Sequence, residues 1–249
     1  MTYELLPRLT VEEYLQLAAS GALDECPHVE LLDGDIIIKK AKTPLHDSSV
    51  DLLVELFSGV LNRDWYVRPQ KLIITEHSCP EPDVAVIRGR PLDYQLRHPR
   101  AAECVVAVEI ATDNVQQDRH KAAIDAHAGI PEYWLVNLVD WQLERMTQPL
   151  PNGRYQQTDL LTANDAVPLI IGDSQVERIA LEELLTPPKR SFTAAWIPTR
   201  RQACRRWAAP VISAGRDRRF VKSSALDHRR RRTVPRFVTA VPQSPTGRR

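Results

Sequence analysis

The first 61 residues carry two helical hydrophobic patterns separated by a strand-like one. Thr10 followed by Glu13 is typical of a capping box and predicts a helix over residues 11–19. Pro44 is typical of a helix start, and apolar residues recur at helical spacing from there to residue 61. Between these helices, two apolar runs flank an Asp-Gly pair, which predicts a β-hairpin over residues 29–38.

Short apolar runs that predict β-strands dominate the chain from residue 65 onward. A third helix is predicted from residue 116 or 118 to residue 128, because Gly129 and Pro131 end it, and a short fourth helix over residues 181–185. Strands mixed with helices on both sides predict an α/β fold with a mixed central sheet. The predicted strands cover residues 65–67, 71–75, 83–87, 104–110, 132–138, 141–146 and 154–159.

Two of these apolar runs contain an acidic residue at one end. Asp83 opens one run and Glu109 lies near the end of another. A carboxylate at the end of a buried strand is costly unless it is paired, hydrogen-bonded or bound to a metal. With Lys121 on the helix that follows, these residue types suit metal-dependent phosphodiester hydrolysis. The alternatives are that Asp83 is a turn residue, that Glu109 pairs with Arg119, and that Lys121 is a solvated surface lysine.

The sequence around these three residues forms an ordered series. Its parts are Pro82-Asp83-Val84, Val108-Glu109-Ile110, residues 118–121 and residues 128–136. The series resembles the Uma-two family of bacterial endonucleases, a branch of the PD-(D/E)XK (restriction-endonuclease-like) superfamily, over approximately residues 5–185. The superfamily usually places its lysine two residues after the second acid, where this chain has Ala111. In the Uma-two branch the lysine has moved onto the following helix, where Lys121 matches it.

The resemblance implies a restriction-endonuclease-like fold and a metal-dependent endodeoxyribonuclease. Asp83, Glu109 and the backbone carbonyl of Ile110 would ligate Mg²⁺, with Mn²⁺ as a substitute, and Lys121 would complete the catalytic set. Glu30 matches an acid that can complete the metal shell, although a solvent-facing acid on an alternating strand explains it equally well. The implied partner is DNA, without an organic cofactor. A homodimer is possible, because nucleases of this architecture often act as dimers.

One histidine and two aromatic residues also bear on the site. His46 falls where the family carries a histidine, which could contact a phosphate or support Glu30, or simply begin a helix. Tyr133 and Trp134 are expected to be core residues. Two other functions remain open, a catalytically inactive nucleic-acid-binding protein on the same fold and a structural or partner-binding domain.

The charge of the chain is unevenly distributed. The total net charge is +1, but residues 187–249 contain 17 lysines and arginines and two acids, which leaves a net charge of −14 on the rest. The basic segment lacks sustained hydrophobic periodicity, so we expect a disordered tail appended to a nuclease-like domain at residues 1–186. The tail could bind nucleic-acid phosphates, or it could be a solvated extension.

Cysteine usage and hydropathy bear on the location of the protein. The four cysteines lie far apart without a Cys-X-X-Cys pair, which argues against disulfides and a zinc site. The first residues lack a basic start and an apolar signal core. No stretch approaches the roughly 18 consecutive apolar residues of a membrane span. We therefore expect a soluble protein of the bacterial cytoplasm, with no membrane partner.

Overall fold

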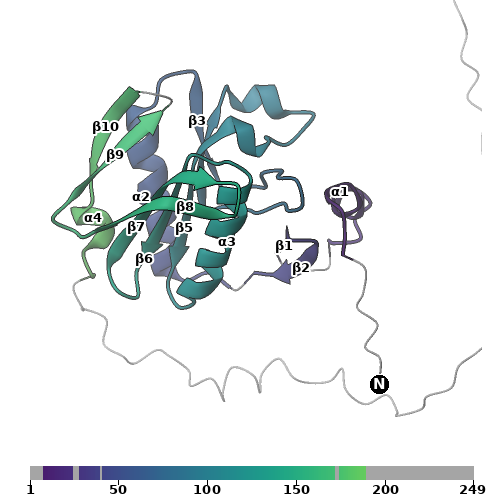
Figure 1. Cartoon of the computed structure of the whole chain (residues 1–249), viewed down its shortest axis with the longest axis horizontal. Coiled ribbons are helices and arrows are strands. Elements are labelled where there is room, and N and C mark those ends of the chain that lie inside the picture. The colour runs from purple at the N-terminus through teal and green to yellow at the C-terminus, as the bar shows by residue number, and fades with distance from the viewer. Residues whose placement is uncertain (1–7, 25–27, 40, 172–173, 189–249) are drawn as a thin grey trace, which may run out of the picture. The chain divides into compact units, whose positions relative to one another are not determined.

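The centre of the structure is a six-stranded sheet in the order β3-β4-β5-β6-β7-β8 (Figure 1). The computed structural model describes residues 8–24, 28–39, 41–171 and 174–188. In the sheet, β5 and β6 are parallel and every other neighbouring pair is antiparallel, which confirms the predicted mixed α/β sheet. The strands and the two longest helices are β3 (Trp65–Pro69), β4 (Val84–Arg88), β5 (Cys104–Ala111), β6 (Glu132–Asn137), β7 (Gln142–Leu150), β8 (Arg154–Leu161), α2 (Pro44–Val60) and α3 (Val115–His127).

The helices α2 and α3 cover opposite faces of this sheet (Figure 1). Val106 of β5 belongs to the apolar cluster that contains Phe57 of α2. Its neighbour Ala107 belongs to the cluster that contains Ala122 of α3. Successive side chains of a strand point to opposite faces of the sheet. Glu109, two residues after Ala107, therefore lies on the α3 face.

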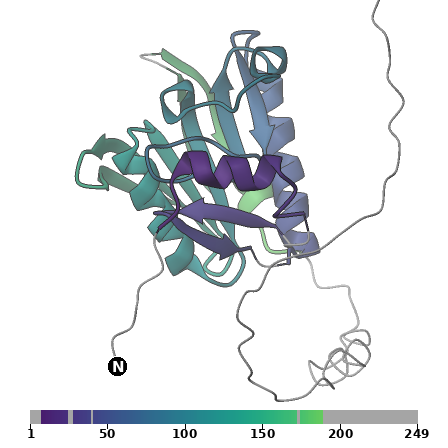
Figure 2. The same cartoon turned by 90° about the vertical axis from the view of Figure 1, so that its right-hand side faces the viewer.

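The predicted hairpin and its flanking helix lie beside one another (Figure 2). The hairpin consists of β1 (Val29–Leu32) and β2 (Asp35–Ile38), and α1 (Val11–Ala19) packs next to it. The predicted capping box is confirmed, because the Glu13 N–H donates to Thr10 Oγ1 at 3.2 Å and the Thr10 N–H donates to Glu13 Oε2 at 2.8 Å. The capping box and the Asp-Gly hairpin could be predicted from the sequence because each pattern depends on neighbouring residues alone.

A second hairpin near the end of the described chain was not predicted. It consists of β9 (Ala166–Ile171) and β10 (Ser174–Ala180), and the predicted final helix follows it as α4 (Glu182–Leu185). The pairing of β9 with β10 shifts register between Gln175 and Glu177. Pro168 within β9 weakens the strand signal, because proline removes a backbone donor from the ladder.

The predicted strand over residues 71–75 is wrong. Only Ile74 of that segment forms an isolated bridge, with Arg100. Leu72 and Ile73 are buried as the strand pattern required, but the backbone does not pair along a neighbouring strand. The apolar run at residues 71–75 therefore reflects burial of side chains in the core and not pairing in a sheet.

Two further expectations concern the ends of elements and of the chain. The third helix begins at Val115, slightly before the predicted start, with Asn114 as its N-cap. The predicted basic tail falls almost entirely outside the described residues, since residues 189–249 are not among them. Within the described residues, no helix has the length and apolar character needed to cross a membrane.

Candidate metal and catalytic centre

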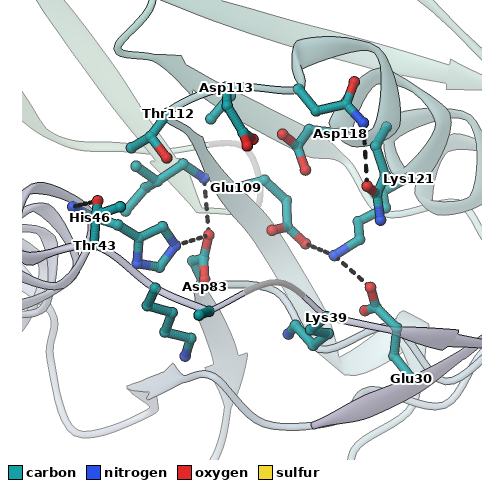
Figure 3. A pocket seen from close by; sticks show the side chains of 16 residues that line it. Glu30, Lys39, Thr43, His46, Asp83, Glu109, Thr112, Asp113, Asp118 and Lys121 are labelled. Atoms are coloured by element: carbon teal, nitrogen blue, oxygen red, sulfur yellow. Dashed lines mark hydrogen bonds and ion pairs between the residues drawn. The ribbon is translucent and has the colours of Figure 1, made fainter. Parts of the chain in front are cut away.

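A polar cavity of about 130 Å³ lies where β4 begins and β5 ends (Figure 3). Val84 of β4 pairs with Val108 of β5, so Asp83 and Glu109 each stand one residue beyond this pair at the same edge of the sheet. The cavity brings together every residue that the sequence predicted for the site. Its ionisable side chains are Glu30, Lys39, Lys42, His46, Asp83, Glu109, Asp113, Asp118 and Lys121.

Asp83 is held by two hydrogen bonds to the same carboxylate oxygen. The backbone N–H of Ile110 donates to Oδ2 at 3.0 Å, and Nε2 of His46 lies 3.0 Å from it. Burial alone would raise the pKa of the Asp83 carboxyl, but the hydrogen bond and charge of His46 and the Ile110 amide outweigh burial and lower it. Asp83 is therefore ionised and fixed in place, and it is more than a turn residue.

The backbone of Ile110 faces the cavity. Its N–H donates to the Asp83 side chain rather than to a strand, because β4 starts only at Val84. In an antiparallel arrangement the N–H and C=O of one residue point to the same neighbour. The carbonyl oxygen of Ile110 therefore points to the Asp83 side, and Ile110 lines the cavity. A carbonyl oxygen in this orientation is what the predicted role of Ile110 as a metal ligand requires.

Lys121 lies between two acidic side chains (Figure 3). Its Nζ is 3.0 Å from Glu109 Oε1 and 2.8 Å from Glu30 Oε1. Lys121 is 4% exposed, so the alternative of a solvated surface lysine is wrong. Arg119, the alternative partner of Glu109, instead forms an ion pair with Glu144. Burial opposes the charge of Lys121, but the two carboxylates outweigh it and raise its pKa above the ordinary value.

Glu30 is fully buried, which contradicts the alternative of a solvent-facing acid. Besides its ion pair with Lys121, its Oε2 accepts a hydrogen bond from the backbone N–H of Glu81 at 3.2 Å. The hairpin therefore contributes an acid that holds the lysine from the side opposite Glu109 (Figure 3). Its contacts are with the lysine and the backbone, and its role as a metal ligand stays a prediction.

The cavity contains more negative than positive groups. Burial raises the pKa of Glu109 well above its ordinary value, and the carboxylates of Asp83 and Glu30 add to this effect against the opposing charge of Lys121. Burial and neighbouring acids also raise the pKa of Asp118 to about 6. Carboxyl groups shifted in this direction are stabilised in their ionised form by a nearby cation.

The donor atoms of the cavity fit a hard divalent cation. Oδ1 of Asp83 and Oε2 of Glu109 have no hydrogen-bond or ion-pair partner among the described residues, since the contacts of both carboxylates use the other oxygen. Mg²⁺ and Mn²⁺ prefer oxygen ligands, and Mg²⁺ is commonly held by one or two carboxylates and retains several waters. Two carboxylate oxygens and the Ile110 carbonyl match that preference.

Sequence reasoning missed or misplaced three kinds of residue. His46 was considered as support for Glu30, but the structure places it against Asp83. Asp118, three residues before Lys121 on the same helix, also lines the cavity, although it was not among the predicted site residues. Lys39 and Lys42 also line the cavity and had no motif that distinguished them from other lysines. These contacts depend on how the hairpin and helices meet the sheet.

The model of the Uma2 (Uma-two) family, described as "Putative restriction endonuclease", matches residues 11–177. That range contains the whole six-stranded sheet and every residue of the cavity. The chain belongs to the Uma2 family. The predicted family and its restriction-endonuclease-like fold are thus confirmed, and the match supports a nuclease.

A solved structure is similar to this Uma2 chain. It is the crystal structure of "a putative nuclease belonging to DUF820" from Anabaena variabilis, with a TM-score of 0.58 and 16% sequence identity. The match covers 71% of this chain and 97% of that chain. At this identity the likeness shows the fold alone. A comparison with curated proteins gave no match.

Proposed function

We propose that this Uma2 protein is a Mg²⁺-dependent endonuclease that hydrolyses phosphodiester bonds of DNA. The observation that supports this function best is the meeting of Asp83, Glu109 and Lys121 in one polar cavity, each of them 4% exposed. Three buried charged groups are costly to maintain in a fold unless they are compensated. The ion pair of Lys121 compensates part of this charge, and a bound divalent cation would compensate the rest.

Each residue has a role that follows from its contacts. The carboxylates of Asp83 and Glu109 and the carbonyl of Ile110 would hold Mg²⁺, and the bound ion would supply Lewis-acid activation of the attacking water and of the scissile phosphate. Lys121 stays protonated because its pKa is raised, so its ammonium can donate to the attacking water or to a phosphate oxygen. Glu30 orients that ammonium from the other side.

The family description supports DNA as the substrate, because it names restriction endonucleases. The proposal includes a location in the bacterial cytoplasm. Cys79 and Cys104 support it, because both are free and buried, as expected for a protein kept in reducing surroundings. Lys39 and Lys42 at the cavity offer positive charge for the phosphates next to the scissile bond.

Metal removal tests the proposal. Purified protein incubated with supercoiled plasmid and Mg²⁺ or Mn²⁺ should convert it to nicked or linear DNA, whereas the same protein with EDTA should leave it supercoiled. Gel electrophoresis measures the products. Binding of the plasmid without cleavage in any divalent metal would support the inactive nucleic-acid-binding alternative. Absence of both Mn²⁺ binding by calorimetry and DNA binding would support a structural domain.

Substitution of His46 should have an effect of intermediate size on cleavage. His46→Ala should lower cleavage about ten- to a hundredfold, because the residues that orient a metal ligand commonly contribute that much to affinity or activity. Asp83 would keep its bond from Ile110 but lose the one from His46. The matched control is His77→Ala, because the His77 side chain is 69% exposed and lies outside the cavity. Equal cleavage rates for the two variants would remove His46 from the site.

A further inference from the structure

One edge strand of the structure is both apolar and unpaired. β2 pairs with β1 on one side, and no strand among the described residues pairs with its other side. β1, by contrast, is occupied on both sides, because Leu31 also bridges Cys79. Ile36 is 37% exposed and Ile38 is 65% exposed. An exposed apolar edge strand pairs readily with another strand unless it is protected.

The free edge of β2 presents the backbone groups of Ile36 and Ile38. The N–H of Lys39 donates to the carbonyl of His28 on the β1 side at 2.8 Å. Because successive residues of a strand point their backbone groups to alternate sides, the N–H and C=O of Ile38 and Ile36 point away from β1. Neither residue makes a backbone hydrogen bond on that side within the described part of the chain.

Another edge strand of the structure is protected where β2 is not. β8, at one edge of the large sheet, exposes a polar series that includes Arg154, Gln156 and Gln157, and Leu160 is the single large apolar residue that it exposes. Charged and polar residues at an edge discourage association with another strand. In β2, three consecutive isoleucines stand between Asp35 and Lys39. The contrast indicates that the β2 edge is suited to a partner.

We propose that β2 pairs antiparallel with β2 of a second copy of this chain, across a twofold axis at Ile37. In this register Ile36 of each copy stands opposite Ile38 of the other, and Asp35 stands opposite Lys39. The pairing is therefore self-complementary, as a twofold interface requires, because apolar residues meet apolar ones on both sides of the axis. The Ile36–Ile38 pairs are those whose backbone groups point outward, so each exchanges two backbone hydrogen bonds.

The pairing also covers the exposed isoleucines. α1 packs its Val11 and Tyr14 against Leu31 of β1, while Ile36 and Ile38 of β2 lie outside that apolar cluster. Antiparallel pairing at an edge places the twofold axis perpendicular to the sheet and keeps the same face of both hairpins on one side. The isoleucines of both copies then form one apolar strip between the two α1 helices.

The arrangement has a consequence for the cavity. Glu30, which lines the cavity, is paired with Ile37 and shares its face of the hairpin. The two cavities of the dimer would therefore open toward the same side of the joined sheet. This consequence, unlike the dimer itself, rests on the proposed function, in which two sites on one side could act on both strands of a duplex.

The mass of the full chain in solution tests the dimer. Sedimentation velocity over about 1–100 µM protein should give twice the chain mass of 28.3 kDa. Ile38→Lys should raise the dissociation constant at least about tenfold, because the pairing would bury two lysines beside the axis. The control Leu160→Lys changes a residue of similar exposure, 63%, on the edge strand β8 and should leave the mass unchanged. A monomeric wild type, or an unchanged Ile38→Lys dimer, would overturn the proposal.

A cysteine on the twofold axis tests the register and does not depend on weakening the fold. Residues in a non-hydrogen-bonded antiparallel pair have Cα atoms about 4.5 Å apart, within the reach of a disulfide. Ile37→Cys should therefore form an intermolecular disulfide under mild oxidation, seen as a doubled mass on a non-reducing gel. Ile38→Cys stands opposite Ile36 and should cross-link no more than wild type. Equal cross-linking of both variants would contradict this register.

Discussion

Glu109→Gln should reduce metal-dependent cleavage of DNA to at most about a thousandth of the wild-type rate. The amide keeps the volume of the side chain but removes the charge that holds a divalent cation. It also weakens one of the two ion pairs of Lys121, whose Nζ is 3.0 Å from Glu109 Oε1. Both changes impair cleavage of the phosphodiester bond, so the loss of cleavage rate should exceed that caused by His46→Ala.

The matched control for this variant is Glu144→Gln. Glu144 and Glu109 are each 4% exposed, and each is paired with a basic side chain, but Glu144 pairs with Arg119 and lies outside the cavity. Cleavage should therefore survive in Glu144→Gln. Calorimetry with Mn²⁺ should show affinity reduced at least about tenfold in Glu109→Gln alone. If Glu109→Gln cleaves at the wild-type rate, Glu109 is not a metal ligand and the nuclease proposal loses its main support.

The elements of the fold were predictable where the signal is local. The capping box of α1, the Asp-Gly turn of the first hairpin and the proline at the start of α2 each depend on a few adjacent residues. The segment over residues 71–75 shows the limit of such signals. Its apolar residues are buried against the core without pairing in the sheet, and hydrophobic pattern reports burial rather than backbone pairing.

The sequence was sufficient to predict which residues form the site, but not which of them contact one another. Asp83 and Glu109 were found because each is an acid at the end of an apolar run, and Lys121 because of the family resemblance. That His46 meets Asp83, and that Glu30 meets Lys121, depends on how α2 and the hairpin are placed against the sheet. These contacts join residues at least 37 positions apart in sequence, and no short-range pattern encodes them.

Lys121→Ala should reduce turnover at least about a hundredfold without lowering the affinity for Mn²⁺. Lysine is not a metal ligand, and its removal leaves the carboxylates of Asp83 and Glu109 in place. The loss of the buried cation leaves Glu30 and Glu109 uncompensated and should cost stability, of the order of 3–5 kcal/mol for a broken buried pair. Retained Mn²⁺ binding therefore serves as the check that the cavity is still formed. The control Lys71→Ala changes an exposed lysine and should cleave at the wild-type rate.

Restoring the usual superfamily pattern should recover part of this activity. Ala111 lies on the same face of β5 as Glu109 and lines the cavity, so a lysine there can direct its ammonium to the same place. Ala111 is 2% exposed and packs in a cluster with Ala122 and Tyr133, so the longer side chain should fit with strain and recovery should be partial. Lys121→Ala with Ala111→Lys should thus cleave faster than Lys121→Ala alone. The same background with Ala111→Met adds comparable volume without charge, and equal recovery there would show that the ammonium is not the cause.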